Sequence, residues 1–444
     1  MIDKFIDENL ENIKADLKEL VSYNSILNDD ALPFGSENRK VLDSTLKIME
    51  RNGFKTKNLD YYCGYGEIGQ GDKLVGIAAH LDIVPVSEGW NTDPFVLTEK
   101  DGKLFGRGVS DDKGPAILAM YALKYLKESG YIFNKRFRLL LGCNEETGSK
   151  CMDYYSEHDE PFSMGFTPDA DFPGIYAEKG VFGCNLIGKS KIKDIKGGEA
   201  TNIVCGKVTA IINSNDYNQE KFKEYLDKNN IKYEIDGDNV IVYGKTSHAS
   251  IPQYGINAIN YLFEALTYSG FEDSYTNTMS KLFALTTDGS LLGINKFNDD
   301  ISVATTNLGV IRKQGDSISC SLDIRFPVKT KTDDFVNYIK TNETSDFKMV
   351  DISVANPLYY DKNAKWIQAL KKAYSDVTND KNTDLLAIGG GTYAKHLKNV
   401  IAFGNKFIGE NTHIHESNEE LSIESLKKQI IIYVEAIKNL NEVE

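Results

Sequence analysis

The sequence lacks the features that mark membrane, secreted and nucleic-acid-binding proteins. It contains no run of 18 consecutive apolar residues, so no membrane-spanning helix is expected. The N-terminal residues show no basic region followed by an apolar core, so we expect no signal peptide and a cytoplasmic location. The formal net charge is −14, so we expect no basic surface for nucleic acid.

Several cofactor motifs are also missing. The six cysteines include no Cys-x-x-Cys pair, which argues against a zinc ribbon or a redox dithiol. In a long chain without an export signal, free buried thiols are expected rather than disulfides. The Gly389-Gly390-Gly391 run lacks the Lys-Ser/Thr of a phosphate-binding loop, and no G-x-G-x-x-G occurs. We therefore expect the backbone of Gly390 and Gly391 to approach a substrate closely.

Metal-binding and acidic residues are instead concentrated in five short segments. Together these segments hold three of the six histidines and nine acidic residues. The segments are His80-Leu81-Asp82, Ser110 to Gly114, Asn144 to Gly148, Pro168 to Asp171, and His413 to Glu419. Imidazole and carboxylate ligands with one spare carboxylate as a base are what a two-metal hydrolase requires.

Three of the five segments follow predicted buried strands. Continuous apolar runs of this length are typical of strands that are covered on both faces. The runs and the residues after them are 74–79 with His80 and Asp82, 137–142 with Glu145 and Glu146, and 164–166 with Asp169. Ligand sites of open α/β sheets lie beyond the carboxyl ends of the strands, so these side chains are expected to meet there.

The chain is expected to form a discontinuous α/β domain and an insertion. Residues 1–180 and 355–444 alternate strands and helices, which predicts a mixed, mostly parallel sheet flanked by helices. Residues 181–354 contain short alternating runs with intervening helices, which predicts an α+β domain with an antiparallel sheet. Because His415 lies in the returning α/β segment, the second domain is expected to interrupt the first.

The residue pattern alone leaves the individual roles open. Either Asp111 or Asp112 could bridge two cations, and an Asp there could equally cap the following helix. One of the adjacent Glu145 and Glu146 could bind metal while the other takes a proton, although an acidic surface turn has the same pattern. Of His413 and His415, one is expected to face the site. Asp82 could orient His80 or a neighbouring ligand.

At these residues the chain resembles a known metallopeptidase family. This family includes acetylornithine deacetylase, succinyl-diaminopimelate desuccinylase, aminoacylase and carnosinase. The segments HLDIVP, GRGVSDDKGP, NEETGS and HESNE match its motifs in order, and the match spans nearly the whole chain. The tracts TPDADFP, ATNIV and GGGTYAK resemble the bacterial dipeptidase branch of Xaa-His dipeptidases and manganese-dependent dipeptidases.

The resemblance implies hydrolysis of dipeptides by two divalent ions, Zn²⁺ or Mn²⁺, with Glu145 as general base on a water between the ions. Other implied roles place Asp82 in support of His80, and His248 and Asn202 near the oxygen of the tetrahedral intermediate. Arg325 would hold the C-terminal carboxylate of the peptide. The implied metal ligands are Asp111 as the bridge, His80 and Asp169 on one ion, and Glu146 and His415 on the other.

Two departures from the family pattern concern specificity. Lys395 stands where relatives usually carry Arg, and Asp171 stands where Glu is commoner. An N-acyl-amino-acid deacylase or desuccinylase of the same fold is the alternative activity, and a non-catalytic metal-binding protein is a remote one. The long inserted domain is similar to that of monomeric relatives, which implies a monomer acting on small peptides.

Overall fold

The computed structural model describes residues 1–444, and the chain divides into two compact units. The units are 1–176, 360–386 and 391–444 for the first, and 177–359 and 387–390 for the second. These limits differ by a few residues from the expected 180/181 and 354/355. The short segment 387–390, which the sequence pattern assigned to the first domain, groups with the second unit.

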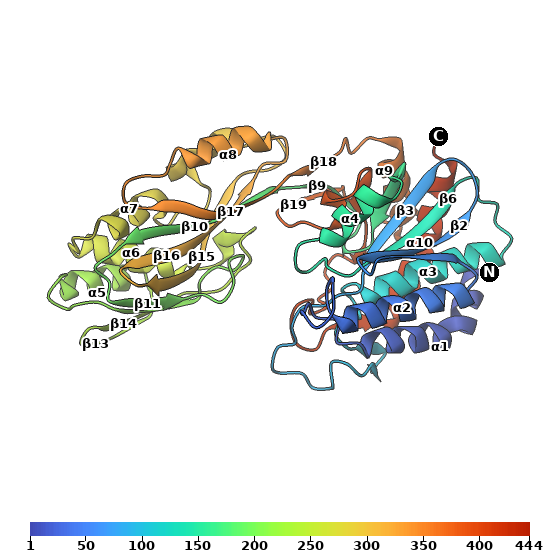
Figure 1. The fold of residues 1–444 in the computed structure, drawn as a ribbon, viewed down its shortest axis with the longest axis horizontal. Coiled ribbons are helices and arrows are strands. Elements are labelled where there is room, and N and C mark those ends of the chain that lie inside the picture. Colours follow the sequence, from blue (N-terminus) through green and yellow to red (C-terminus); the bar gives the residue numbers. More distant parts are fainter. The chain divides into compact units, whose positions relative to one another are not determined.

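A nine-stranded mixed sheet, six of whose strands lie entirely within the first unit, forms the core of that unit (Figure 1). Its strands are β1 (Lys55–Leu59), β2 (Cys63–Gly69), β3 (Leu74–His80), β6 (Arg136–Gly142), β7 (Met164–Thr167), β9 (Ile175–Glu178), β18 (Leu358–Tyr359), β19 (Leu386–Ile388) and β20 (Val400–Ala402). The order is β1-β2-β6-β3-β7-β20-β9-β18, with β19 beside β9. The central strands β6, β3, β7 and β20 are parallel, and the outer pairings are antiparallel.

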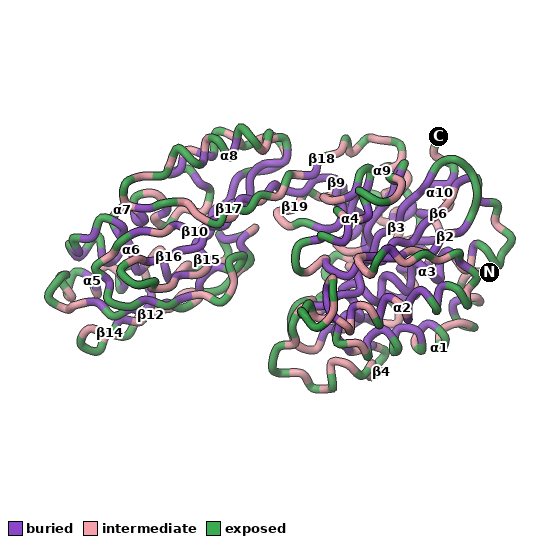
Figure 2. Tube along the Cα trace, viewed as in Figure 1, coloured by how far each residue is buried: buried purple, intermediate pink, exposed green.

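The buried character of the central strands explains why they occupy the middle of the sheet. Every residue of β3 is buried, and all of β6 is buried except Arg136 (Figure 2). Strands that are covered on both faces have continuous apolar sequences of this kind. The α/β fold class is confirmed, and within this sheet parallel pairing is confined to the central strands.

Helices and short strands complete the first unit. Amphipathic α1 directs Ile6, Ile13 and Leu17 inward at helical spacing. The helices are α1 (Ile2–Val21), α2 (Ser36–Arg51), α3 (Lys113–Glu128), α4 (Lys150–His158), α9 (Lys365–Thr378), α10 (Ile423–Glu442) and the 3-10 turn η4 (Tyr393–Lys395). The short strands are β4 (Thr98–Lys100), β5 (Lys103–Phe105), β8 (Ala170–Asp171), β21 (Asn405–Lys406) and β22 (Glu420–Ser422).

The second unit is an eight-stranded antiparallel sheet with helices, as expected. The strands are β10 (Gly180–Lys189), β11 (Asp194–Gly197), β12 (Lys207–Ile211), β13 (Tyr233–Asp236), β14 (Asn239–Tyr243), β15 (Thr305–Gln314), β16 (Ser317–Phe326) and β17 (Lys348–Ala355). Their order is β13-β14-β12-β11-β15-β16-β10-β17. The helices are α5 (Gln219–Lys228), α6 (Ala258–Tyr268), α7 (Ser274–Phe283), α8 (Thr332–Lys340) and the 3-10 turns η1 (Pro252–Tyr254), η2 (Ser290–Leu292) and η3 (Ile294–Phe297).

The cysteines and helices agree with two expectations from the composition. All six cysteines are free and buried, which confirms that they are apolar core residues and form no disulfide. None of the helices is both long enough and apolar enough to span a lipid bilayer.

Candidate metal centre

The carboxyl ends of three neighbouring strands deliver most of the expected site residues. β3 ends at His80, β6 leads into Glu145 and Glu146, and β7 leads into Asp169. Because β6, β3 and β7 are parallel neighbours, the residues that follow them lie at the same edge of the sheet. This is the edge at which open α/β sheets bind their ligands.

The carboxylate of Asp111 lies between two imidazoles. Its Oδ1 is 2.8 Å from Nε2 of His80, and its Oδ2 is 2.9 Å from Nε2 of His415. Nε2 of His415 is also 3.1 Å from Oε1 of Glu146. These contacts bring together four residues from segments that are far apart in the sequence. Of the two adjacent aspartates, Asp111 is the one whose carboxylate contacts the imidazole rings.

Two groups of ligand atoms lie close enough to hold cations. The ligand atoms of His80, Asp111 and Glu146 lie within 4.8 Å of one another, and so do those of His80, Glu145 and Asp169. Oδ2 of Asp169 is 3.9 Å from Nε2 of His80. Imidazole suits Zn²⁺ and carboxylate oxygens suit Mn²⁺, so the donor set fits divalent ions of either kind.

Asp82 contacts both His80 and the turn that carries the two glutamates. Nδ1 of His80 lies 3.0 Å from the backbone carbonyl of Asp82 and 3.6 Å from its carboxylate, so the carbonyl orients the ring. The Asp82 carboxylate instead accepts the backbone N–H groups of Glu145 over 2.9 Å and Glu146 over 3.1 Å. The side chain of Asp82 therefore positions the turn that carries the two glutamates.

Burial and the crowding of acids set the pKa values of the centre. Burial raises the pKa of Glu145 to about 8, and the charges of Glu146 and Asp82 act in the same direction. Burial and the charge of Asp111 raise the pKa of Asp169 above its usual range. Burial disfavours the ionised form of Asp111 too, yet its hydrogen bonds to the two histidines hold its pKa well below the usual range. Divalent cations would relieve this mutual repulsion, so the electrostatics fit a metal site.

Two buried residues beside the centre have no role predicted from the residue pattern. Arg107 and Glu419 form an ion pair of 2.8 Å, and both side chains are almost completely buried. The carboxylate of Glu419 also accepts the backbone N–H of Asp111 over 2.9 Å. The only signal for these residues in the sequence is that they fall inside the GRGVSDDKGP and HESNE segments.

The second unit holds His248 and Asn202 next to each other through the backbone. The N–H of Ala249 donates to the carbonyl of Asn202 over 2.8 Å, and Ile203 forms a β-bridge with His248. The backbone N–H of Ser250 donates to Nδ1 of His248 over 3.1 Å. Because Nδ1 accepts this hydrogen bond, the neutral ring carries its proton on Nε2. Nε2 of His248 is therefore a hydrogen-bond donor.

Arg325 is already paired within the second unit. Its Nε and Nη2 donate to the two carboxylate oxygens of Asp323 over 2.7 and 2.9 Å, and its Nη1 donates to the carbonyl of Gly389 over 3.1 Å. The edge of the guanidinium formed by Nε and Nη2 is therefore occupied, and contact of Arg325 with a peptide carboxylate stays a prediction. Two N–H groups, one on each Nη, remain for a ligand. Arg325 and Asn202 both line a hollow of about 370 Å³.

The three consecutive glycines are not equivalent. A Cβ on Gly389 would lie 2.5 Å from Cβ of Ser250, so this glycine permits the close approach of the segment that supports His248. A Cβ on Gly391 would lie 3.1 Å from Nζ of Lys395, whereas Gly390 has no neighbour closer than 3.6 Å. Only Gly390 thus has room for a side chain, and contact of Gly390 or Gly391 with a substrate stays a prediction.

His413 and Asp171 also lie in the segments that match the family. Their ion-pair partners lie outside the cluster of His80, Asp111, Glu146 and His415. Nδ1 of His413 lies 3.2 Å from Oε2 of Glu416, so His415 and not His413 contacts the carboxylates of the centre. Asp171 forms a 2.9 Å ion pair with Lys406. The Asp171 side chain is therefore used in a pairing between two neighbouring short strands.

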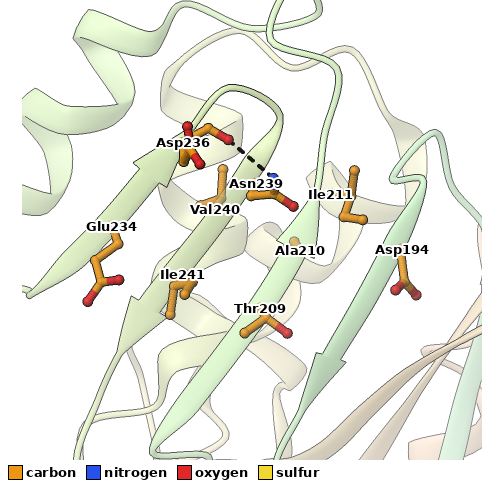
Figure 3. Close-up of a pocket in the computed structure, with 9 residues that line it drawn as sticks. All are labelled: Asp194, Thr209, Ala210, Ile211, Glu234, Asp236, Asn239, Val240 and Ile241. Atoms are coloured by element: carbon orange, nitrogen blue, oxygen red, sulfur yellow. Dashed lines mark hydrogen bonds between the residues drawn. The ribbon is translucent and has the colours of Figure 1, made fainter.

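A separate hollow of about 480 Å³ lies on the open face of the second unit's sheet (Figure 3). Three carboxylates line it: Asp194 is on β11, and Glu234 and Asp236 are on β13 (Figure 3). The other lining residues are Thr209, Ala210, Ile211, Asn239, Val240 and Ile241. This hollow contains no histidine, cysteine or converging set of ligand atoms, so we assign it no part in the chemistry.

The chain is similar along nearly its whole length to bacterial proteins that are named as dipeptidases. "Putative dipeptidase YtjP" of Bacillus subtilis is 32% identical over 453 residues, which cover 97% of each chain. "Putative dipeptidase SH1171" of Staphylococcus haemolyticus is 32% identical over 464 residues, which cover 98% of each chain.

Solved structures share the fold at low sequence identity. Human carnosine dipeptidase 1 has a TM-score of 0.59 at 14% identity, with 100% of this chain and 99% of that chain covered. The dipeptidase Dug1p of Saccharomyces cerevisiae has a TM-score of 0.60 at 16% identity, with 100% and 98% covered. Residues 76–439 match the family described as Peptidase family M20/M25/M40. The chain therefore belongs to peptidase family M20/M25/M40.

Proposed function

We propose that the protein is a dipeptidase that uses two divalent metal ions. The observation that carries the proposal is the position of the Asp111 carboxylate. One of its oxygens is 2.8 Å from Nε2 of His80, and the other is 2.9 Å from Nε2 of His415. A carboxylate in this position can bridge two cations, with His80 and Asp169 on one and Glu146 and His415 on the other. Bound divalent ions polarise a carbonyl and lower the pKa of a water molecule.

Glu145 is the proposed general base. It lies in the group of ligand atoms with His80 and Asp169, and it follows directly after the strand that carries the site. Its raised pKa suits a carboxylate that takes a proton and later releases it. Glu145 would accept the proton of the attacking water and deliver it to the nitrogen of the leaving amine. Asp82 holds the backbone of Glu145 in place for this transfer.

His248 is the proposed donor to the oxygen that becomes negative in the transition state. Its Nε2 carries the proton of the neutral ring, because Nδ1 accepts the N–H of Ser250. A fixed donor at such an oxygen is a common source of transition-state stabilisation. His248 belongs to the second unit, so this role requires a substrate that contacts both units. Asn202, which is joined to the His248 segment through the backbone, would contact the same part of the substrate.

Peptides of two residues are the proposed substrates. The relatives from Bacillus and Staphylococcus carry the name dipeptidase, and that name supports the same activity here. Arg325 retains two N–H groups beside the hollow that it shares with Asn202, and these could contact a terminal carboxylate.

A hydrolysis panel tests the proposal. Metal-free protein would be supplied with Zn²⁺, Mn²⁺ or Co²⁺ and offered dipeptides, their C-terminal amides, tripeptides and N-acetyl amino acids. We expect metal-dependent cleavage with the highest kcat/KM on dipeptides. Faster hydrolysis of N-acetyl amino acids would instead indicate a deacylase. Equal rates on a dipeptide and its amide would rule out recognition of the carboxylate by Arg325.

Metal binding should release protons near neutral pH. Burial opposes the positive charge of His415, but its hydrogen bonds to Asp111 and Glu146 outweigh burial and raise its pKa to about 10. His415 is therefore protonated in the metal-free protein at pH 7 and must lose that proton to bind a metal. We expect metal affinity to rise between pH 6 and pH 8. Calorimetry in two buffers of different ionisation enthalpy would measure the released protons, and a release of zero would contradict the expectation.

Replacing His248 with Ala should lower kcat by about 10²–10³-fold, the usual effect of removing one donor to a developing oxyanion. Metal content should not change, because His248 lies outside the metal centre. Ser250→Ala is the matched control: it removes the hydroxyl near Nδ1 but keeps the backbone N–H that sets the tautomer. Steady-state kinetics and metal analysis would check this, and a His248→Ala enzyme no slower than Ser250→Ala would exclude the role.

A further inference from the structure

The carboxylate of Glu419 is saturated with hydrogen bonds from a single loop. Its Oε1 accepts the backbone N–H groups of Ser110 over 2.8 Å and Asp111 over 2.9 Å. Its Oε2 accepts the backbone N–H of Gly108 over 2.9 Å and Nη1 of Arg107 over 2.8 Å. Glu419 is 0% exposed, so water contributes nothing to these contacts. A buried carboxylate with four donors fixes the loop that ends at the bridging Asp111.

Arg107 forms a second connection between the 107–111 loop and the 415–419 loop. While its Nη1 donates to Glu419, its Nη2 donates to the backbone carbonyl of Glu416 over 2.8 Å. Arg107 is 1% exposed and lies over the ring of Trp90. A planar guanidinium can hold two acceptors in fixed directions, which an ammonium group cannot do. Arg107 and Glu419 together therefore fix the 107–111 loop against the 415–419 loop.

These two loops carry metal ligands that must meet. Asp111 is on one loop and His415 is on the other, with 2.9 Å between Oδ2 and Nε2. The 413–418 segment also contains three non-glycine residues with left-handed backbone, with φ of 54° at His413, 63° at His415 and 64° at Asn418. Such conformations are unfavourable for L-residues and persist only where the surroundings hold them. Arg107 holds this segment at the carbonyl of Glu416, and Glu419, the residue that follows the segment, is anchored at the 107–111 loop.

We propose that Glu419, supported by Arg107, is a positioning residue that sets the distance between the bridging carboxylate of Asp111 and the imidazole of His415. The inference rests on the proposed metal function and goes beyond it, because Glu419 is not one of the proposed ligands and its four acceptor contacts are to the 107–111 loop. Its hydrogen bonds act through the ligands, as those of residues around metal sites do. Removing such partners typically weakens metal binding by about 10–100-fold.

The test is Glu419→Gln, which keeps the size of the side chain but replaces one acceptor oxygen with an NH₂ group. The Kd for Mn²⁺ should rise by about 10–100-fold, measured by calorimetry on protein freed of metal. The turnover rate of Glu419→Gln should be closer to that of wild type at saturating Mn²⁺ than at limiting Mn²⁺. Its KM for the peptide should change little. Glu420→Gln is the matched control, since Glu420 is the adjacent residue and forms an ion pair with Lys103.

Separate measurements distinguish positioning from folding. The unfolding midpoint is recorded in chelator for each variant, so that a loss of stability is seen without metal. A fall in the midpoint with an unchanged Kd would mean that Glu419 only stabilises the fold, and the inference would be overturned. If Glu419→Gln fails to fold, Arg107→Lys decides, because it keeps the charge and loses one of the two directed contacts. An unchanged Kd in Arg107→Lys would then overturn the inference, and a raised Kd would support it.

Failure of the inference is distinguishable from failure of the proposed function. Wild-type protein that binds no divalent ion would reject the metal function, and this inference with it. Wild-type protein that binds two ions, with Glu419→Gln binding them equally tightly, would reject the positioning role alone.

Discussion

Replacing Glu145 with Gln should lower kcat by about 10²–10⁴-fold, the usual contribution of a positioned general base. Gln is nearly the same size as Glu, and its amide cannot accept a proton at neutral pH. The backbone N–H of residue 145 would still donate to Asp82, so the turn that carries Glu146 should keep its position. The chemistry should therefore fail while the metal centre remains assembled.

Metal analysis is essential to this experiment, because Glu145 lies among the ligand atoms of His80 and Asp169. A base leaves the metal content unchanged when it is replaced, whereas a ligand does not. Glu157→Gln is the matched control, since Glu157 is an exposed glutamate on α4. Loss of one metal equivalent in Glu145→Gln would reassign Glu145 as a ligand, and a rate close to that of Glu157→Gln would remove it from catalysis.

The location of the site could be predicted from the sequence because it depends on a simple rule of α/β topology. Apolar runs predicted the strands before His80, Glu145 and Asp169, and the structure places these strands side by side and parallel. Parallel neighbours present their carboxyl ends at one edge, so residues that are distant in sequence meet there. The prediction needed no knowledge of side-chain contacts.

Roles that depend on individual contacts could not be predicted in this way. The residue pattern left open whether Asp82 supports His80 or a neighbouring ligand, and in the structure its carbonyl contacts His80 while its carboxylate holds the glutamate turn. Arg325 was expected to hold the carboxylate of a peptide, and the structure adds that Asp323, two residues earlier on the same strand, pairs with one edge of its guanidinium. Alternate residues of a strand share a face, so this pairing could have been considered from the spacing.

One helix of the second unit was also missed for a physical reason. The sequence of α7, SYTNTMSKLF, is rich in Ser, Thr and Asn, which favour helices weakly. Its buried residues Tyr275, Met279 and Phe283 recur at intervals of four, so packing stabilises the helix. Asp273 caps it by accepting the N–H of Thr276 over 2.8 Å. Tertiary packing therefore outweighs the weak local preference.

Replacing Asp111 with Asn should weaken metal binding by more than about 100-fold, because the loss of partners around a ligand already costs 10–100-fold. Both oxygens of Asp111 face imidazoles, so its loss affects both ions at once. By contrast, Glu146→Gln or His415→Ala should weaken mainly the ion that those two residues share. Metal content and affinity would be measured on protein that has been stripped of metal and then reloaded.

Asp112→Asn is the control that decides between the two adjacent aspartates. One oxygen of Asp112 accepts the backbone N–H of His80 over 3.1 Å, and the other contacts no protein donor. An amide oxygen can accept the same N–H, so Asp112→Asn should keep His80 in position and bind metal within about tenfold of wild type. The comparison holds side-chain size constant and changes only which carboxylate is lost. If Asp112→Asn loses more metal than Asp111→Asn, the bridging carboxylate is Asp112, and the assignment of the centre is wrong by one residue.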